Sequence, residues 1–237
     1  MTDLIPALLR RRTRRAGADP VLTYYEPAAG VRVELSAVTL LNWVDKTSHL
    51  LEELDVTTGD AVELPLALTA PGHWMTAVWQ LACWQVGTQV VVGSGLAAPR
   101  LRVCGPDWAP FDDEDDVELV ACSLHPLGLP LAVPPASRVI DYALEVRGQG
   151  DQYPAAVQPP SAPAWWDPER RLTQADLVAA ASGPAARMLV RPSTPWATTQ
   201  VALLRPLVAG GSAVVVTGPV TSGQLTTIAE QERVDPR

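Results

Sequence analysis

Two stretches of the chain repeat the same order of apolar and polar residues. Residues 78–95 read VWQLACWQVGTQVVVGSG, and residues 203–216 read LLRPLVAGGSAVVV. In each, an apolar stretch with helical spacing meets a glycine, Gly87 or Gly210, and then passes into a run of valines. Glycine often ends a helix because it adopts the left-handed conformation without strain, and valine is frequent in buried strands. Both stretches therefore predict a buried helix followed by a buried strand.

The first part of the chain predicts alternating helices and strands. Apolar residues recur every three or four positions over 40–54, and Ser36 is a suitable N-cap for that helix. The expected elements are a helix over 3–15, strands over 21–26 and 31–35, a helix over 40–54, a strand over 61–69, a helix over 73–86 that starts near Pro71, and a strand over 90–92. A strand, a helix and a strand with short connections form a right-handed βαβ unit. The expected fold class is α/β, with mostly parallel sheets flanked by helices.

The rest of the chain is irregular at first and then resumes this alternation. Residues 148–171 are rich in proline and alanine and lack periodicity, which is typical of a connector. We therefore expect a first α/β half over 1–150, a connector over 151–171 and a second half over 172–237, packed as one domain. The expected elements are strands over 100–105 and 117–123, a helix near 139–146, a helix over 172–181 capped by Thr173, a strand over 186–192, a helix over 194–210, a strand over 212–218, and a helix over 220–234 with Ser222 near its N-cap.

The composition is that of a globular protein with an acidic surface. Of the 237 residues, 47% are apolar and 19% are charged, and the formal net charge is −8. A negative charge disfavours nucleic-acid binding. Five arginines between Arg10 and Arg15 are the exception: they would face a membrane or nucleic acid, or form the solvated side of a first helix whose leucines pack on the core, which we favour. No long apolar run follows them, so we expect no signal peptide or membrane span and a cytoplasmic location.

No set of residues has the spacing of a metal site. The three cysteines lack a CxxC pattern and are expected to be small core residues: Cys83, Cys104 and Cys122. The histidines are scattered: His49, His73 and His125. The acidic run over 112–116 lacks the alternating ligands and turn glycine of a calcium loop, so we expect a solvated turn. We predict no metal and no cofactor.

Cys122, His125 and Asp141 are the candidates for nucleophilic catalysis. A histidine oriented by a carboxylate can activate a cysteine. Members of such a triad usually meet through the fold, so their closeness in sequence is weak evidence. We favour a core cysteine beside a loop histidine and assign no catalytic residue. The GSG at 93–95 is too short for a dinucleotide-binding fingerprint.

Trp165 and Trp166 lie in the expected connector. If they are exposed, they form a platform for a ligand or partner. If they are buried, they hold the connector against a sheet. We favour the second interpretation.

Several motifs resemble the N-terminal part of the adenylate-forming enzymes, the superfamily of acyl-CoA synthetases and luciferases. Residues 22–92 contain a hairpin, a long helix, the turn DVTTGD, a strand, and a helix with a glycine before the next strand, in the order of that family. The segment LTQADLVAAA is similar to the family's LTHxNLxA helix, LLRPLVAGGSAVVV to its LLxPLLAGAxVVL segment, and IAEQERV to its IExxRVT helix. The segments SLHPLG and VIDYALEVRGQGDQY also resemble a small actinobacterial family of shortened relatives.

The sequence departs from this family at the phosphate loop. The family has a Ser/Thr/Gly-rich loop that ends in Pro-Lys-Gly directly before the LTHxNL helix, whereas this chain has PAWWDPERR at 163–171. Arg170 and Arg171 are able to bind phosphate, but they do not replace a loop of backbone N–H donors. In the family that the sequence resembles, the catalytic lysine belongs to a C-terminal domain, for which we expect no counterpart here, and the only lysine of the chain, Lys46, lies in the long helix.

The resemblance and the departures together favour a non-catalytic relative, a pseudoenzyme with the α/β fold of a truncated N-terminal domain and a binding, regulatory or assembly role. Shortening such a fold exposes sheet edge or apolar surface, so self-association or a protein partner is expected. The alternative is a nucleotide-binding or acyl-CoA-binding protein, or an enzyme, with a remodelled pocket. We assign no nucleotide-binding residue.

Overall fold

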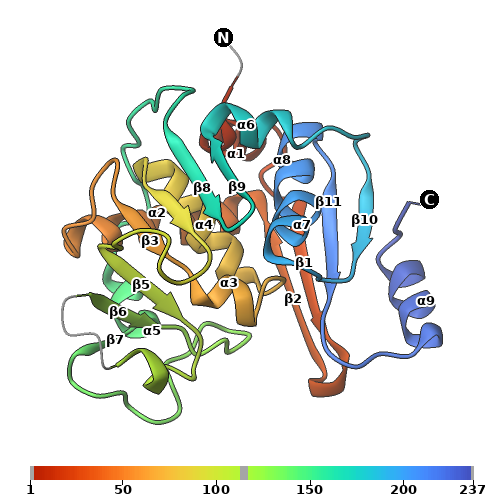
Figure 1. The fold of residues 1–237 in the computed structure, drawn as a ribbon. Coiled ribbons are helices and arrows are strands. Elements are labelled where there is room, and N and C mark those ends of the chain that lie inside the picture. The colour runs from red at the N-terminus through yellow and green to blue at the C-terminus, as the bar shows by residue number, and fades with distance from the viewer. Residues whose placement is uncertain (1–2, 113–116, 236–237) are drawn as a thin grey trace.

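The fold consists of two β-sheets flanked by helices (Figure 1). The computed structural model describes residues 3–112 and 117–235. Within these ranges, one sheet has the strand order β10-β11-β1-β2 and the other the order β7-β6-β5-β3-β4-β8-β9. The α/β architecture with mostly parallel strands is therefore confirmed.

The bounds of the elements follow the chain. The strands of the four-stranded sheet are β1 (Pro20–Glu26), β2 (Val31–Ser36), β10 (Arg187–Val190) and β11 (Ser212–Val216). The strands of the seven-stranded sheet are β3 (Ala61–Glu63), β4 (Gln89–Val91), β5 (Leu101–Cys104), β6 (Glu118–Ala121), β7 (Val139–Asp141), β8 (Pro163–Asp167) and β9 (Arg170–Thr173). The helices are α1 (Ile5–Ala16), α2 (Ala37–Glu53), α3 (Pro65–Thr69), α4 (Trp74–Val86), α5 (Tyr142–Glu145), α6 (Gln174–Ala179), α7 (Pro195–Thr199), α8 (Arg205–Ala209) and α9 (Ser222–Gln231).

The four-stranded sheet joins the beginning and the end of the chain. β1 pairs antiparallel with β2 and parallel with β11, with Leu22 opposite Ala213 and Tyr25 opposite Val216. All five residues of β11 are buried. The late valine run is thus confirmed as a buried strand, and it lies between β10 and β1.

The seven-stranded sheet contains part of the expected connector. Its strands from β7 to β8 are parallel, and β9 returns antiparallel to β8. β8 lies beside β4, with Val90 opposite Trp165. Trp165 is fully buried and Trp166 is half-buried, so the interpretation of Trp165 as a buried anchor is confirmed. The division of the chain at 151–171 remains a prediction.

Helix α4 lies in the core that both sheets share. Each of its residues is buried, and one apolar cluster contains residues of α4 and of both sheets. The side chain of His73 caps the helix, because its Nδ1 accepts a hydrogen bond of 3.2 Å from the backbone N–H of Met75. The helix ends at Gly87, whose φ of 90° favours glycine. A Cβ there would also lie 2.4 Å from Oε1 of Gln158.

Two of the expected elements were wrong, each for a local reason. The strand expected over 61–69 ends at Glu63, because Pro65 occupies the first turn of α3. Residues 139–146 were expected to form a helix, but residues 139–141 form strand β7. Asp141 then caps the short helix α5.

The helix expected over 73–86, starting near Pro71, is confirmed: α4 begins at Trp74, with His73 as its N-cap. Ser222 lies next to the N-cap of the last helix, as expected; the cap itself is Thr221, which forms a capping box with Gln224.

The arginine-rich first helix packs on the core through its apolar side. Ile5, Leu8 and Leu9 are buried. Nη2 of Arg10 donates to Oδ1 of the buried Asp45 at 2.8 Å. The interpretation of α1 as a docked helix with a solvated side is therefore confirmed. Among the helices of residues 3–112 and 117–235, none is long and apolar enough to cross a bilayer.

Glu232 attaches the last helix to the four-stranded sheet. Its carboxylate accepts hydrogen bonds from Nε of Arg32 at 2.8 Å, from the hydroxyl of Tyr25 at 2.5 Å and from Arg187. Burial alone would raise the pKa of Glu232, but the hydrogen bonds from Arg32, Tyr25 and Arg187 together lower it to about 2, from 4.5. The ionised form is therefore favoured in the folded state.

We expect Glu232→Gln to lower the free energy of unfolding at pH 7 by about 2 kcal/mol, because three donors lose a charged acceptor. Since the folded pKa is depressed, the stabilisation is complete above pH 4.5 and is lost as the pH falls toward 2. The difference between wild type and variant should shrink over that range. Urea unfolding at several pH values measures it, with Glu230→Gln on the same helix as the control. An equal loss of stability at pH 7 and pH 2.5 would contradict the role of the charge.

Candidate functional site

The candidate site is the β8–β9 hairpin, at the carboxyl ends of β4 and β8. In parallel sheets, ligands commonly bind at the carboxyl ends of the strands. β8 ends at Asp167, Pro168 and Glu169 form the turn, and Arg170 begins β9 opposite Asp167. A proline directly after an aspartate is typical of a tight turn. The hairpin is therefore specified locally by the sequence DPER.

The carboxylate of Asp167 is surrounded by hydrogen-bond donors. Oδ1 accepts from the backbone N–H groups of Glu169 at 2.9 Å and Arg170 at 3.0 Å. Oδ2 accepts from Nη1 of Arg170 and from Nε1 of Trp165, both at 2.8 Å. Asp167 is 8% exposed. Two backbone amides, one guanidinium and one indole thus surround an anion that belongs to the chain itself.

The two arginines of the hairpin are held by neighbouring side chains. Arg170 also contacts Oε2 of Glu169 at 2.5 Å, and its guanidinium carbon lies 5.6 Å from the ring centroid of Trp196. The guanidinium carbon of Arg171 lies over the ring of Trp166, 3.3 Å from the ring centroid. Arg170, the candidate substitute for a phosphate contact, therefore already pairs with two carboxylates.

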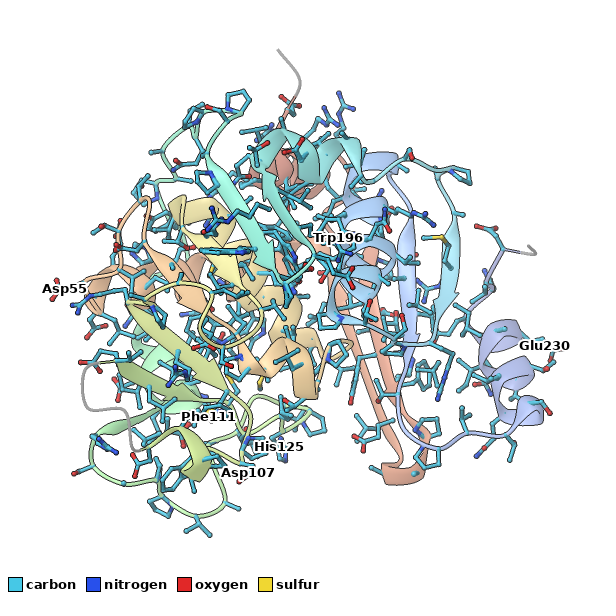
Figure 2. All side chains as sticks on the ribbon, in the orientation of Figure 1. Asp55, Asp107, Phe111, His125, Trp196 and Glu230 are labelled. Carbon is cyan, nitrogen blue, oxygen red and sulfur yellow. The ribbon has the colours of Figure 1, made fainter. Side chains whose placement is uncertain are left out.

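A small hollow lies beside the hairpin. It has a volume of about 170 Å³ and is lined by the turn, Leu68, Val92 and the start of α7. Figure 2 labels Trp196, which forms part of this lining. Pockets for drug-sized ligands have volumes of about 300 to 1,000 Å³. The hollow is smaller than such pockets.

The sequence has a close relative, although no protein-family model matches it. A protein of Mycobacterium tuberculosis (strain ATCC 25618 / H37Rv), named TIGR03089 family protein, is 34% identical over 225 residues, which are 92% of this chain and 91% of the relative. The chain belongs to the TIGR03089 family.

Solved structures show which fold this TIGR03089-family chain has. A Brucella canis acyl-CoA synthetase has a TM-score of 0.77 at 14% identity, and a benzoate CoA ligase from Burkholderia xenovorans LB400 has 0.72 at 13%. The N-terminal domain of FACL13 from Mycobacterium tuberculosis has 0.69 at 16%. Each match covers 98% of this chain but 46%, 49% and 62% of the respective solved chain. The chain has the fold of the N-terminal domain of acyl-CoA synthetases. It spans about half the length of the solved chains of the Brucella canis acyl-CoA synthetase and of the benzoate CoA ligase.

Cys122, His125 and Asp141 each form hydrogen bonds with other groups in this TIGR03089-family protein. Sγ of Cys122 is buried and accepts a hydrogen bond of 3.3 Å from Nε1 of Trp79. Nδ1 of His125 accepts from the backbone N–H of Leu127 at 3.1 Å. Asp141 accepts from two backbone N–H groups, at 2.8 and 3.0 Å. Each side chain thus stabilises its own local structure.

The other titratable residues named from the sequence also have structural roles. Burial lowers the pKa of His73 to about 4, although the Leu124 carbonyl acts in the opposite direction. Nζ of Lys46 donates to the backbone oxygen of Gln149 and pairs with Asp151 at 2.9 Å. His49 contacts the backbone oxygen of Gln152 at 2.9 Å.

Asp112 of the acidic run and the glycines of the glycine-rich segment have local structural roles. Asp112 pairs with Arg138 at 2.7 Å, and residues 113–116 lie outside the described residues. Gly93 and Gly95 have positive φ angles in the turns after β4. No group of three or more His, Cys, Asp or Glu side chains in the described part of the chain is arranged to hold a metal ion.

Asp167, Glu169 and Trp196 belong to the site but were assigned no role from the sequence. Asp-Pro before Glu-Arg signals a turn in which aspartate accepts hydrogen bonds from the following backbone N–H groups. That signal was available at Asp167. No local pattern places Trp196, because it approaches the hairpin from α7, 26 residues later.

We expect all three thiols to be unreactive in the native protein. Burial raises the pKa of Cys83 and of Cys104 to about 12 and raises that of Cys122 further. A thiol reagent such as DTNB at pH 8 should therefore release no chromophore from the folded chain and three equivalents after unfolding in urea. A fast-reacting thiol that is lost in Cys122→Ser would reopen the nucleophile interpretation.

We expect Asp167→Ala to lower the free energy of unfolding by about 2 to 4 kcal/mol, because four donors lose their acceptor. The indole N–H resonance of Trp165 should also shift. Chemical denaturation and ¹H–¹⁵N spectra measure both effects, and Asp107→Ala, at the exposed residue labelled in Figure 2, is the matched control. Equal stability of the two variants would show that the hairpin does not depend on the carboxylate.

Proposed function

We propose that this protein is a non-catalytic relative of adenylate-forming enzymes with a binding or assembly role. The observation that supports it is the environment of Asp167. In the family that the sequence resembles, a phosphate loop precedes the helix that corresponds to LTQADL. Here that position is a tight hairpin, and its amide donors bind a carboxylate of the chain.

A triphosphate would have to compete with this carboxylate. The N–H groups of Glu169 and Arg170 already donate to Asp167. Displacing Asp167 would leave its charge buried near the incoming phosphate, and like charges at close range are unfavourable. The carboxylate of Glu169 adds a second negative charge at the turn. Electrostatics thus oppose nucleotide binding at this position.

Transition-state stabilisation requires donors that are free when charge develops. Adenylation spreads negative charge over phosphate oxygens, and catalysis depends on preorganised donors directed at them. The guanidinium of Arg170 pairs with Asp167 and Glu169, and that of Arg171 stacks on Trp166. Neither arginine is arranged for this task.

A role in assembly agrees with the remaining features. The fold presents sheet edges, and open edges pair readily with other chains. Exposed large apolar side chains occur at several places, including Leu127, Val133 and Val157. We propose that the protein acts through association with itself or with another protein.

We expect calorimetric titration with ATP, AMP or acyl-CoA, with and without Mg²⁺, to give no saturable binding at ligand concentrations up to about 1 mM. Exchange of labelled pyrophosphate into ATP should be absent as well. A benzoate CoA ligase serves as the positive control. Saturable ATP binding that is abolished in Arg170→Ala would support the alternative, a protein with a remodelled nucleotide pocket.

A further inference from the structure

The outer edge of strand β2 is open. Within the described ranges, β2 is the terminal strand of its sheet and pairs only with β1. The opposite edge of the same sheet, β10, is capped at its start: the backbone N–H of Asp235 donates to the Arg187 oxygen at 2.9 Å, and Oδ2 of Asp235 accepts from the Arg187 N–H at 2.6 Å. The start of the β10 edge is thus covered, whereas in the described ranges no strand lies along the outer edge of β2.

The residues of β2 alternate in a pattern that is complementary to itself. Val31, Val33 and Leu35 pack on the main core. Arg32 and Glu34 are exposed, lie on the opposite face and pair with each other at 2.6 Å. The edge therefore carries one positive and one negative side chain, placed on either side of Val33.

We propose that β2 pairs antiparallel with β2 of a second copy of this chain, around a two-fold axis at Val33. Paired residues must share a face, so the axis passes through a residue. An axis at Arg32 places two arginines opposite each other, and an axis at Glu34 places two glutamates opposite each other. An axis at Val33 places each Arg32 opposite Glu34 of the other copy. The charges select this register.

The resulting assembly is a continuous eight-stranded sheet. Both copies contribute the order β10-β11-β1-β2. Arg32 keeps its bond through Nε to Glu232 and turns Nη2 toward the second copy. Cross-strand pairs of opposite charge are stabilising, and like pairs are destabilising. Stable dimers bury about 1,200 Å² or more of surface in total, and pairing along one six-residue strand buries less. The association should therefore be weak.

Disulfide trapping tests the register. In the proposed dimer, the two Val33 positions are opposite each other, at a distance that a disulfide spans. The two Val31 positions are four residues apart along the strand, about 13 Å. We expect Val33→Cys to form a covalent dimer under mild oxidation at least about tenfold faster than Val31→Cys, its neighbour on the same face. The native cysteines are buried and do not interfere.

Charge reversal tests the ion pairs. Glu34→Lys in the Val33→Cys chain places two cations opposite each other and should slow trapping at least about threefold. Glu230→Lys, at the exposed residue labelled in Figure 2, makes the same change of net charge on α9 and should leave the rate unchanged. Thermal melting of each reduced variant verifies its fold.

Equal trapping of the Val31 and Val33 variants, or no effect of Glu34→Lys, would overturn the inference. So would a monomer at all concentrations in analytical ultracentrifugation of the native chain. The inference rests on the proposed assembly role and deepens it. A dimer in ultracentrifugation without Val33 trapping would reject the β2 register and leave the assembly role standing. The ATP titration and the pyrophosphate exchange test the loss of nucleotide binding and of catalysis separately.

Discussion

The parallel pairing of β1 with β11 is the contact on which the rest of the fold depends. It joins residues 20–26 to residues 212–216, so the chain between them must leave the four-stranded sheet, build the seven-stranded sheet and return. The closed core requires an apolar layer that both sheets can share, and α4 supplies it with every residue buried. The same pairing places β2 at the outer edge, with β1 as its neighbour.

The β8–β9 hairpin depends on this arrangement as well. β8 is held by its pairing with β4 and by the buried Trp165, so the turn is fixed at the carboxyl ends of the parallel strands. A fold of this kind commonly binds a ligand there. Here the donors converge on Asp167, and the arginine that is best placed to bind phosphate is neutralised by adjacent carboxylates. At this turn, the donors of the hairpin are hydrogen-bonded to a carboxylate of the chain itself.

Many of the helices and strands could be predicted from the local sequence, and those that could not have physical causes. The helix-glycine-strand pattern predicted α4 and β11, because burial periodicity and glycine stops are local signals. The short strands were harder to predict. Pro65 ends β3 early, and β8 lies in a proline-rich stretch in which apolar and polar residues do not alternate. Pairing of β8 with β4 is long-range, and no pattern in either strand specifies it. The hydrogen bonds of Asp167 depend on that pairing, so the inward-facing donors became visible only in the fold.

The central claim is that the donors of the hairpin are occupied by the chain's own carboxylate. The most direct test is a series of ¹H–¹⁵N spectra during a titration with Mg-ATP, following the backbone amides of Glu169 and Arg170. This account predicts that neither resonance moves beyond the small shift that exposed amides show at the same ionic strength. Saturable shifts at these two amides would show that ATP reaches the donors and would contradict the account.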